Sequence, residues 1–323
     1  MWAYYFYRMI RRARQVWLLF DSRTEGVKGG EESRYIKQLE LHFHAPLTRH
    51  VMQAEIRTPD DEGQIPKTEE HLRILREKSL SASALQKYLD CPARFYYHSV
   101  CGLKEQEEVT EALEANDIGN VFHKTMQVLY KTPDGQVGRA YLESLLKSGR
   151  VRETVRQFML EALHSFELSG RNILFEDLVC SYVRKTVERD LEQLAAAGRD
   201  SITILGLELD RHLEIGGFRF VGFIDRLDSI VPGEVRVVDY KTGKVTDNDF
   251  LITEDNADAV VDKLFGPDNG RRPKIALQLY LYDRFVAKDP KVKGCRIVNS
   301  IYQTSRLFVR EIENVALNER FLS

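Results

Sequence analysis

Apolar and polar residues alternate in three consecutive runs between residues 201 and 244, and these runs predict β-strands. The runs are ITILGLELDRHLEI at 202–215, FRFVGFIDRLDSI at 218–230 and VRVVDYKTGK at 235–244. Gly-Gly and Pro-Gly pairs separate them, and short turns of this kind join neighbouring antiparallel strands. We therefore expect an antiparallel three-stranded meander.

Runs with apolar residues at helical spacing surround these strands in the chain. Residues 119–131 (GNVFHKTMQVLYK) predict a short amphipathic helix, and residues 140–197 show helical spacing almost throughout. A predicted helix at 274–288 and a last predicted strand at 295–303 follow the meander. This order indicates an α/β domain with a mixed β-sheet flanked by helices.

The first fifty residues differ from the rest of the chain. They predict a helix with an arginine cluster that runs into an apolar strand at 16–20, and then a helix at 31–43. Such a segment is too short to bury a core of its own. Charged residues with prolines and a glycine follow, which suits a linker, and Ser81 predicts a cap for the next helix. The sequence therefore predicts three parts: residues 1–50, a linker at 51–79, and a domain at 80–323.

Charge and cysteine content narrow the function only a little. The formal net charge is −2 at pH 7, so a nucleic-acid partner needs a local patch and bound cations to offset the carboxylates. The four cysteines form no CxxC pair, which favours reduced thiols. The apolar opening has arginines in its middle, unlike a signal peptide, and no run is long enough to span a bilayer. We therefore expect a cytoplasmic protein with no membrane partner.

Three polar residues of the predicted meander indicate chemistry. Asp225 lies in the second strand and Asp239 at the end of the third, so the two carboxylates can converge on one hard cation. Lys241 comes two residues after Asp239 and therefore shares its strand face. A bound cation with a lysine beside it is the arrangement that phosphodiester hydrolysis needs.

A plainer interpretation makes Asp225 an ordinary acid near a turn, and Asp239 with Lys241 a surface ion pair. Both aspartates, however, are embedded in apolar β-runs, where an unpaired charge is costly. This cost favours a functional site over a solvated surface.

The runs GFIDRLD at 222–228 and VVDYKTGK at 237–244 resemble the nuclease domain of the RecB/AddB family, a branch of the PD-(D/E)XK superfamily. The resemblance spans roughly residues 80 to 303. Three further motifs stand in the family's order: Cys91-Pro-Ala-Arg-Phe95, Gly119-Asn-Val-Phe-His123, and Gln278 with Tyr282 one helical turn later. Each motif alone is weak, but their combined order is specific.

The resemblance implies a restriction-endonuclease-like PD-(D/E)XK core with a helical insertion. It also implies a metal-dependent deoxyribonuclease, an exonuclease in DNA repair or recombination, with DNA as substrate and Mg²⁺ or Mn²⁺ as cofactor. Lys241 would position the attacking water. The implied metal ligands are His123, Asp225, Asp239 and the backbone carbonyl of Tyr240, and the implied catalytic residues are Asp225, Asp239, Lys241, Gln278 and Tyr282.

Several of these residues also have plainer interpretations. A lone histidine on an amphipathic helix usually packs or faces solvent, and only the downstream motif favours His123 as a ligand. Gln278 interrupts an apolar run and needs a buried partner, either within a core helix or in the site. Glu208 lies where members of this family often carry a glutamate, and its role stays open.

The chain departs from the family pattern after the predicted domain's last strand. Some AddB-type relatives hold an iron–sulfur cluster with one cysteine before the domain and three after it. Cys91 takes the first position, but no cysteine follows Cys295, so we expect no cluster and a small, buried Cys91. Within the first fifty residues, the run YFYRMIRRARQVWLLFDSRTEG at 5–26 resembles the arginine-bearing last motif of a superfamily-one helicase, yet the chain has no P-loop motif. The resemblance implies a helicase-like remnant there, and a helicase region or helicase–nuclease subunit as partner. A basic helix and a strand that pack on the nuclease domain are the alternative.

Two other function classes stay open. One is a nuclease fold without activity that only binds DNA or a partner, although the presence of Asp225, Asp239 and Lys241 speaks against it. The other is a ribonuclease, and the lack of an aromatic RNA-binding run is weak evidence against that class.

Overall fold

The computed structural model divides the chain into two units, residues 1–64 and 65–323. Among the described residues, no helix combines the length and the apolar character needed to cross a bilayer. The residues that the structure describes are 2–20, 24–25, 28–29, 32–50, 65–103, 113–243, 245–246, 249, 252–253, 255–266, 272–304, 306–308 and 313–315.

The first unit buries little apolar surface. Its described elements are α1 (Trp2–Ile10), β1 (Thr24–Glu25), β2 (Lys28–Gly29) and α2 (Arg34–Leu41). The rings of Phe6 and Tyr35 stack with centroids 5.1 Å apart, and Ile36 is the only buried apolar residue among those described in this unit. The strand predicted at 16–20 is wrong. No strand among the described residues pairs with this run, and Trp17 stays exposed.

The second unit is built on one 7-stranded sheet, in which β4, β5, β6, β7, β8 and β9 follow one another and β3 pairs with β6. The predicted antiparallel meander is confirmed as β5-β6-β7, and β8 runs parallel to β7. The predicted α/β fold with a mixed sheet is therefore confirmed. The strands are β3 (Ser79–Leu80), β4 (Gln136–Gly138), β5 (Ser201–Ile215), β6 (Phe218–Ser229), β7 (Glu234–Lys241), β8 (Arg296–Gln303) and β9 (Glu313–Val315).

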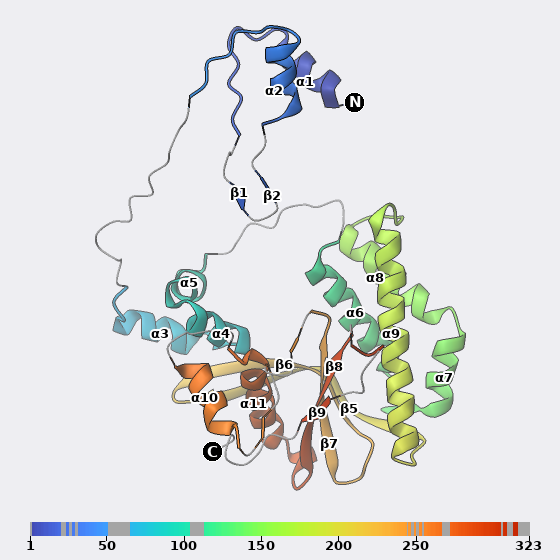
Figure 1. Cartoon of the computed structure of the whole chain (residues 1–323). Helices are drawn as coiled ribbons and strands as arrows, with labels where there is room; N and C mark the ends of the chain where they lie inside the picture. The colour runs from blue at the N-terminus through green and yellow to red at the C-terminus, as the bar shows by residue number, and fades with distance from the viewer. Residues whose placement is uncertain are drawn as a thin grey trace. The chain divides into compact units, whose positions relative to one another are not determined.

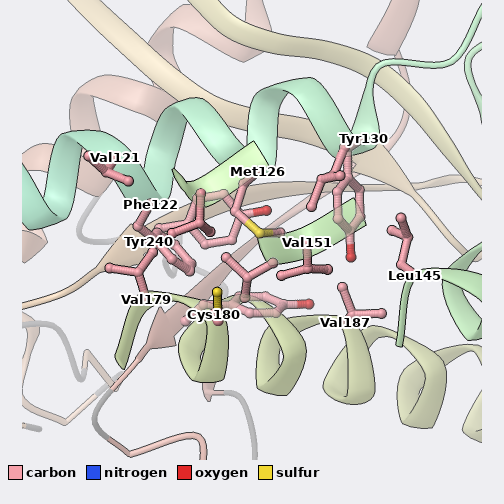
Figure 2. Close-up of a cluster of buried hydrophobic side chains, with 14 of the residues drawn as sticks. Val121, Phe122, Met126, Tyr130, Leu145, Val151, Val179, Cys180, Val187 and Tyr240 are labelled. Atoms are coloured by element: carbon pink, nitrogen blue, oxygen red, sulfur yellow. The ribbon is translucent and has the colours of Figure 1, made fainter. Parts of the chain in front are cut away.

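One helical layer packs on the face of the sheet that carries Val238, Tyr240 and Tyr302. Its helices are α6 (Ala115–Tyr130), α7 (Arg139–Lys147), α8 (Arg150–Leu163) and α9 (Arg171–Ala196), and Figure 1 shows them grouped on one side of the sheet. Figure 2 shows Met126 of α6 above Cys180 of α9, within the apolar cluster that joins the two helices. This packing places α6, and the histidine that it carries, against the strands.

The second helical layer covers the opposite face, where Ile224, Val237 and Ile301 lie. Its main helices are α4 (Ala82–Asp90), α10 (Ala257–Phe265) and α11 (Lys274–Ala287). The chain passes from β7 to β8 through α10 and α11, because parallel strands need a long crossover connection. The crossover brings α11 over the strands that carry the predicted site residues.

Helix α3 (Glu69–Glu77) lies inside the predicted linker and contacts β6. Thr68 caps it, because the Thr68 side chain accepts a hydrogen bond from the amide of His71. Residues 51–64 of the predicted linker lie outside the described residues. The capping role expected of Ser81 is confirmed, since its side chain accepts from the amide of Ala84 at the start of α4.

Cys91 is exposed, and the expectation that it is buried is wrong. It stands between α4 and the short helix α5 (Pro92–Phe95), where its Sγ accepts a hydrogen bond from the amide of Arg94 at 3.5 Å. Cys91 ends α4 and caps α5, so its side chain bonds to the start of α5 instead of packing into the core. The π-helix η1 (Tyr96–Val100) and the 3₁₀ helix η3 (Pro290–Val292) complete the described helices of this unit.

Four charged side chains are buried together between the sheet and α9, and we call them the core ion-pair cluster. They are Asp190, Arg226, Asp228 and Arg236. The Arg226 guanidinium donates two hydrogen bonds to Asp190, of 2.8 and 3.0 Å, and the Arg236 guanidinium donates two to Asp228, of 2.7 and 2.8 Å. Tyr130 also donates to Asp190, at 2.5 Å. The formal charges cancel, and such mutual pairing offsets the cost of burying each charge.

Asp283 of α11 is a buried acid that accepts a hydrogen bond of 2.9 Å from the Asn299 amide on β8. Burial raises its pKa to about 6, and the bond from Asn299 opposes the rise. Because the pKa is higher in the folded state than in the unfolded state, the folded protein is most stable where the Asp283 carboxyl is neutral. This stabilisation is fully present below the unfolded pKa, near 3.9, and it is lost as the pH rises through the folded pKa of about 6. We therefore expect Asp283→Asn to gain up to about 3 kcal/mol over the parent between about pH 4 and pH 8.

Urea unfolding of both proteins across this pH range measures the gain. Asp200→Asn is the control, because it makes the same replacement at a side chain that is almost wholly exposed. The prediction would be contradicted if the free energies of unfolding of Asp283→Asn and the parent differed by the same amount at every pH.

Candidate metal centre

His123, Glu208 and Asp225 converge from three elements, and we call them the histidine–acid group. One ligand atom of each lies within 4.8 Å of the others. The His123 Nδ1 atom lies 3.3 Å from Asp225 Oδ1 and 3.8 Å from Glu208 Oε1. Helix α6 carries His123, while β5 and β6 carry the two acids.

Gly119 allows α6 to approach the end of β7. A Cβ atom at Gly119 would lie 3.1 Å from Thr242 Oγ1, closer than nine in ten real contacts of this kind. Because Gly119 is one helical turn before His123, this close approach also sets the height of the imidazole over the strands. The Gly-x-x-x-His spacing thus has a structural reason in this chain.

Glu208 adopts a left-handed backbone conformation inside a β-strand, with φ of +47°. Non-glycine residues in this region cost roughly 1–3 kcal/mol, and they concentrate at functional sites. The pairing of β5 with β6 also shifts register nearby, between Ile204 and Gly206. The distorted strand directs the Glu208 carboxylate to His123. The sequence pattern left the role of Glu208 open, although a lone acid between two leucines in an apolar run was a signal.

Asp225 connects the histidine–acid group to β7. Its Oδ2 atom accepts a hydrogen bond of 2.7 Å from the backbone amide of Tyr240, while Oδ1 faces His123. The Tyr240 ring lies in the buried cluster on the α6 side (Figure 2), and it packs edge-on against the His123 imidazole with ring centroids 5.8 Å apart. The metal-ligand role expected of the Tyr240 carbonyl stays a prediction.

Asp239, Lys241 and Gln278 form a second set of contacts, which we call the lysine group. Lys241 Nζ lies 3.1 Å and 2.8 Å from the two carboxylate oxygens of Asp239. It also donates to Gln278 Oε1 at 2.9 Å, and Gln278 Nε2 donates to Asp239 Oδ1 at 3.0 Å. Gln278 therefore finds its buried partners among the predicted site residues.

Tyr282 supports Gln278 from the next turn of α11. Its hydroxyl accepts a 2.7 Å hydrogen bond from Gln278 Nε2 and donates one of 2.7 Å to the carbonyl of Phe223 on β6. The helix comes this close because Gly222 has no side chain: a Cβ there would lie 2.4 Å from the Phe285 ring. Tyr282 thus ties α11 to the strand that carries Asp225.

The electrostatics of the site indicate that it accommodates positive charge. Burial alone would lower the pKa of His123, but its hydrogen bonds with Asp225 and Glu208 outweigh burial and raise the pKa to about 10. A cation bound by His123 would take the place of this proton, because only the neutral imidazole is a metal ligand. Burial also raises the pKa of Asp239; Lys241 opposes this rise and the nearby Asp225 adds to it.

The residues present fit a divalent cation. Asp239 Oδ2 is buried and accepts no hydrogen bond, although it lies close to the Lys241 ammonium. Three carboxylates and one imidazole form a mixed oxygen and nitrogen donor set, which suits Mg²⁺ or Mn²⁺. Asp239 lies outside the three residues that already converge, so it would join the ligands from the lysine group.

Comparisons with known proteins agree with this geometry. The family model of the PD-(D/E)XK nuclease superfamily matches residues 79–300. An uncharacterised protein of Rickettsia conorii is 20% identical over 203 residues, which are 59% of this chain and 22% of that protein. An uncharacterised protein of Rickettsia bellii is 22% identical over 202 residues, with the same two shares of 59% and 22%.

A Streptococcus agalactiae protein, named as a subunit of an ATP-dependent helicase/deoxyribonuclease, is 24% identical over 172 residues, which are 50% of this chain and 14% of that protein. The chain thus spans between 14% and 22% of the length of these relatives. The family match, in contrast, covers more than half of this chain and the whole β5-β6-β7 meander. The chain therefore belongs to the PD-(D/E)XK nuclease superfamily.

Proposed function

We propose that this chain is a metal-dependent DNA nuclease that acts as an exonuclease in DNA repair or recombination. One observation carries the proposal: the histidine–acid group and the lysine group are joined through Asp225. The Asp225 carboxylate belongs to the first group and accepts a hydrogen bond from the backbone amide of Tyr240, the residue after Asp239 of the second group. A helicase region or helicase–nuclease subunit is the proposed partner. The name of the Streptococcus relative, which combines a helicase with a deoxyribonuclease, supports this partner and DNA as the substrate.

Each residue has a part in the proposed mechanism. A divalent cation held by His123, Asp225 and Asp239, together with the Tyr240 carbonyl, would supply a hydroxide nucleophile and neutralise phosphate charge. Lys241 would donate from Nζ to the attacking water and hold it in line with the scissile phosphate. Gln278 keeps the Lys241 ammonium beside Asp239, and Tyr282 in turn fixes Gln278.

A cleavage assay with matched DNA substrates tests the proposal. We expect the full chain to degrade linear DNA in Mg²⁺ or Mn²⁺ and to lose this activity in EDTA. Covalently closed circular DNA of the same sequence should persist, because an exonuclease needs an end. No cleavage of any DNA with either cation would leave a nuclease fold that only binds, and cleavage of RNA alone would indicate a ribonuclease.

Glu208 should contribute to cation binding, because its carboxylate reaches the histidine–acid group only through a costly backbone conformation. We expect Glu208→Gln to weaken Mn²⁺ binding by at least about 10-fold. Isothermal titration of the full chain with Mn²⁺ measures the change. Glu214→Gln is the matched control, since Glu214 is an exposed acid of the same strand. Equal Mn²⁺ affinities of Glu208→Gln and the parent would exclude Glu208 as a ligand.

A further inference from the structure

Phe223 is a large apolar side chain that stays 55% exposed beside the candidate metal centre. It precedes Asp225 by two residues on β6, a separation of about 7 Å between Cα atoms. The proposed mechanism gives no role to its side chain. Its backbone carbonyl is nevertheless fixed, because the Tyr282 hydroxyl donates to it at 2.7 Å.

The direction of the Phe223 ring follows from its neighbours on β6. Phe220 and Ile224 are buried in the cluster that includes α11, and Gly222 faces the Phe285 ring of the same helix. Successive side chains of a strand point to opposite faces of the sheet. Phe223 therefore lies on the face away from α11, the face from which α6 approaches the site.

Charges around the ring restrict what can cover it. Asp210 of β5 pairs directly with Phe223, and its carboxylate, which is 54% exposed, lies 3.1 Å from His212 Nε2. An acid beside the ring does not attract the phosphates of a DNA backbone, but it leaves the face of the phenyl ring free for an uncharged, flat group. A nucleobase is such a group.

We propose that Phe223 is a stacking platform for an unpaired base of the DNA strand whose scissile phosphate occupies the metal centre. This inference rests on the proposed nuclease function and names its substrate class. In a duplex, both faces of a base are already stacked, so a side chain reaches a base face only in single strands or at frayed ends. The substrate of this site is thus single-stranded DNA or an unpaired end.

Binding measurements on the full chain test this inference. Every protein carries Lys241→Ala, so that DNA is bound but not cut, and Mn²⁺ is present. The probes are a fluorescein-labelled oligothymidylate of about twelve nucleotides and a hairpin duplex of about equal length, read by fluorescence anisotropy. Phe223→Ala is expected to weaken oligothymidylate binding by about 5- to 50-fold and to leave duplex binding unchanged. Its Mn²⁺ affinity, measured by isothermal titration, should equal that of Lys241→Ala alone.

Three variants separate stacking from other effects. Phe223→Trp should restore binding, because it keeps an aromatic face, whereas Phe223→Leu should bind as weakly as Phe223→Ala although it keeps the apolar bulk. Phe166→Ala is the matched control, since Phe166 is fully exposed between α8 and α9 and should not affect DNA binding.

Two outcomes would overturn the inference in distinguishable ways. If Phe223→Ala binds oligothymidylate like its parent while the wild-type chain cuts DNA, the nuclease function stands and the stacking role of Phe223 is refuted. If the wild-type chain neither binds nor cuts DNA with Mg²⁺ or Mn²⁺, the proposed function and the inference fall together.

Discussion

Lys241→Ala is expected to lower the rate of DNA cleavage by about 10²–10³-fold, the usual loss when one donor to the reacting groups is removed. Lys241 has no ligand atom to offer a cation, but its ammonium lies beside Asp239 and is held there by Gln278. Its removal should take away the group proposed to orient water and leave the proposed ligands in place. Single-turnover cleavage of linear DNA in Mg²⁺, together with titration of Mn²⁺ binding, measures the two effects separately.

Asp239→Ala provides the contrasting result. This variant should lose both cleavage and measurable Mn²⁺ binding, because it removes the buried carboxylate with an unsatisfied oxygen. Lys147→Ala, at an exposed lysine of α7, is the control and should cut DNA at the parental rate. Wild-type cleavage by Lys241→Ala in Mg²⁺ would refute the role assigned to this lysine.

Asp190→Ala is expected to lower the free energy of unfolding by about 3–5 kcal/mol, because it leaves the fully buried Arg226 without its main partner. Two hydrogen bonds from Arg226 end on this carboxylate, and the hydroxyls of Tyr130 and Tyr302 also donate to it. Burial alone would raise the pKa of Asp190, but the charge of Arg226 outweighs it and lowers the pKa. Denaturant unfolding of the full chain at neutral pH measures the loss.

Asp177→Ala is the control for this experiment within the same helix. Asp177 pairs with Arg152 at 2.6 Å, but both side chains are about half exposed, and exposed ion pairs contribute about 1 kcal/mol or less. The two variants therefore remove the same carboxylate from buried and solvated surroundings. If Asp190→Ala and Asp177→Ala lowered the free energy of unfolding by similar amounts, burial would not make the Asp190 ion pair more important for stability than an exposed pair.

The sequence alone determined the central strands and indicated the candidate site residues. The alternation of apolar and polar residues in β5, β6 and β7 follows from the period of a strand with distinct faces, a local property. Gly-Gly and Pro-Gly pairs determined the turns between them. Acids inside such runs, Asp225 and Asp239, indicated a site because isolated buried charges are unstable.

The sequence predicted less where structure depends on a partner. The apolar run at 16–20 forms no strand, since strand pairing needs a neighbour that local pattern does not reveal. The short strands β3, β4 and β9 were not predicted, because two or three residues give no readable period. Cys91 was expected in a core but caps α5 at the surface, a position that depends on where two helices end.

Only the tertiary structure decided how the site is assembled. The strand distortion at Glu208 brings a second acid to His123 beside Asp225, and the lack of a side chain at Gly119 lets α6 approach Thr242 closely. The partners of Gln278 likewise come from another element, β7. These contacts join residues that are distant in the chain, and their geometry follows from how helices and strands pack, which no local pattern of residues encodes.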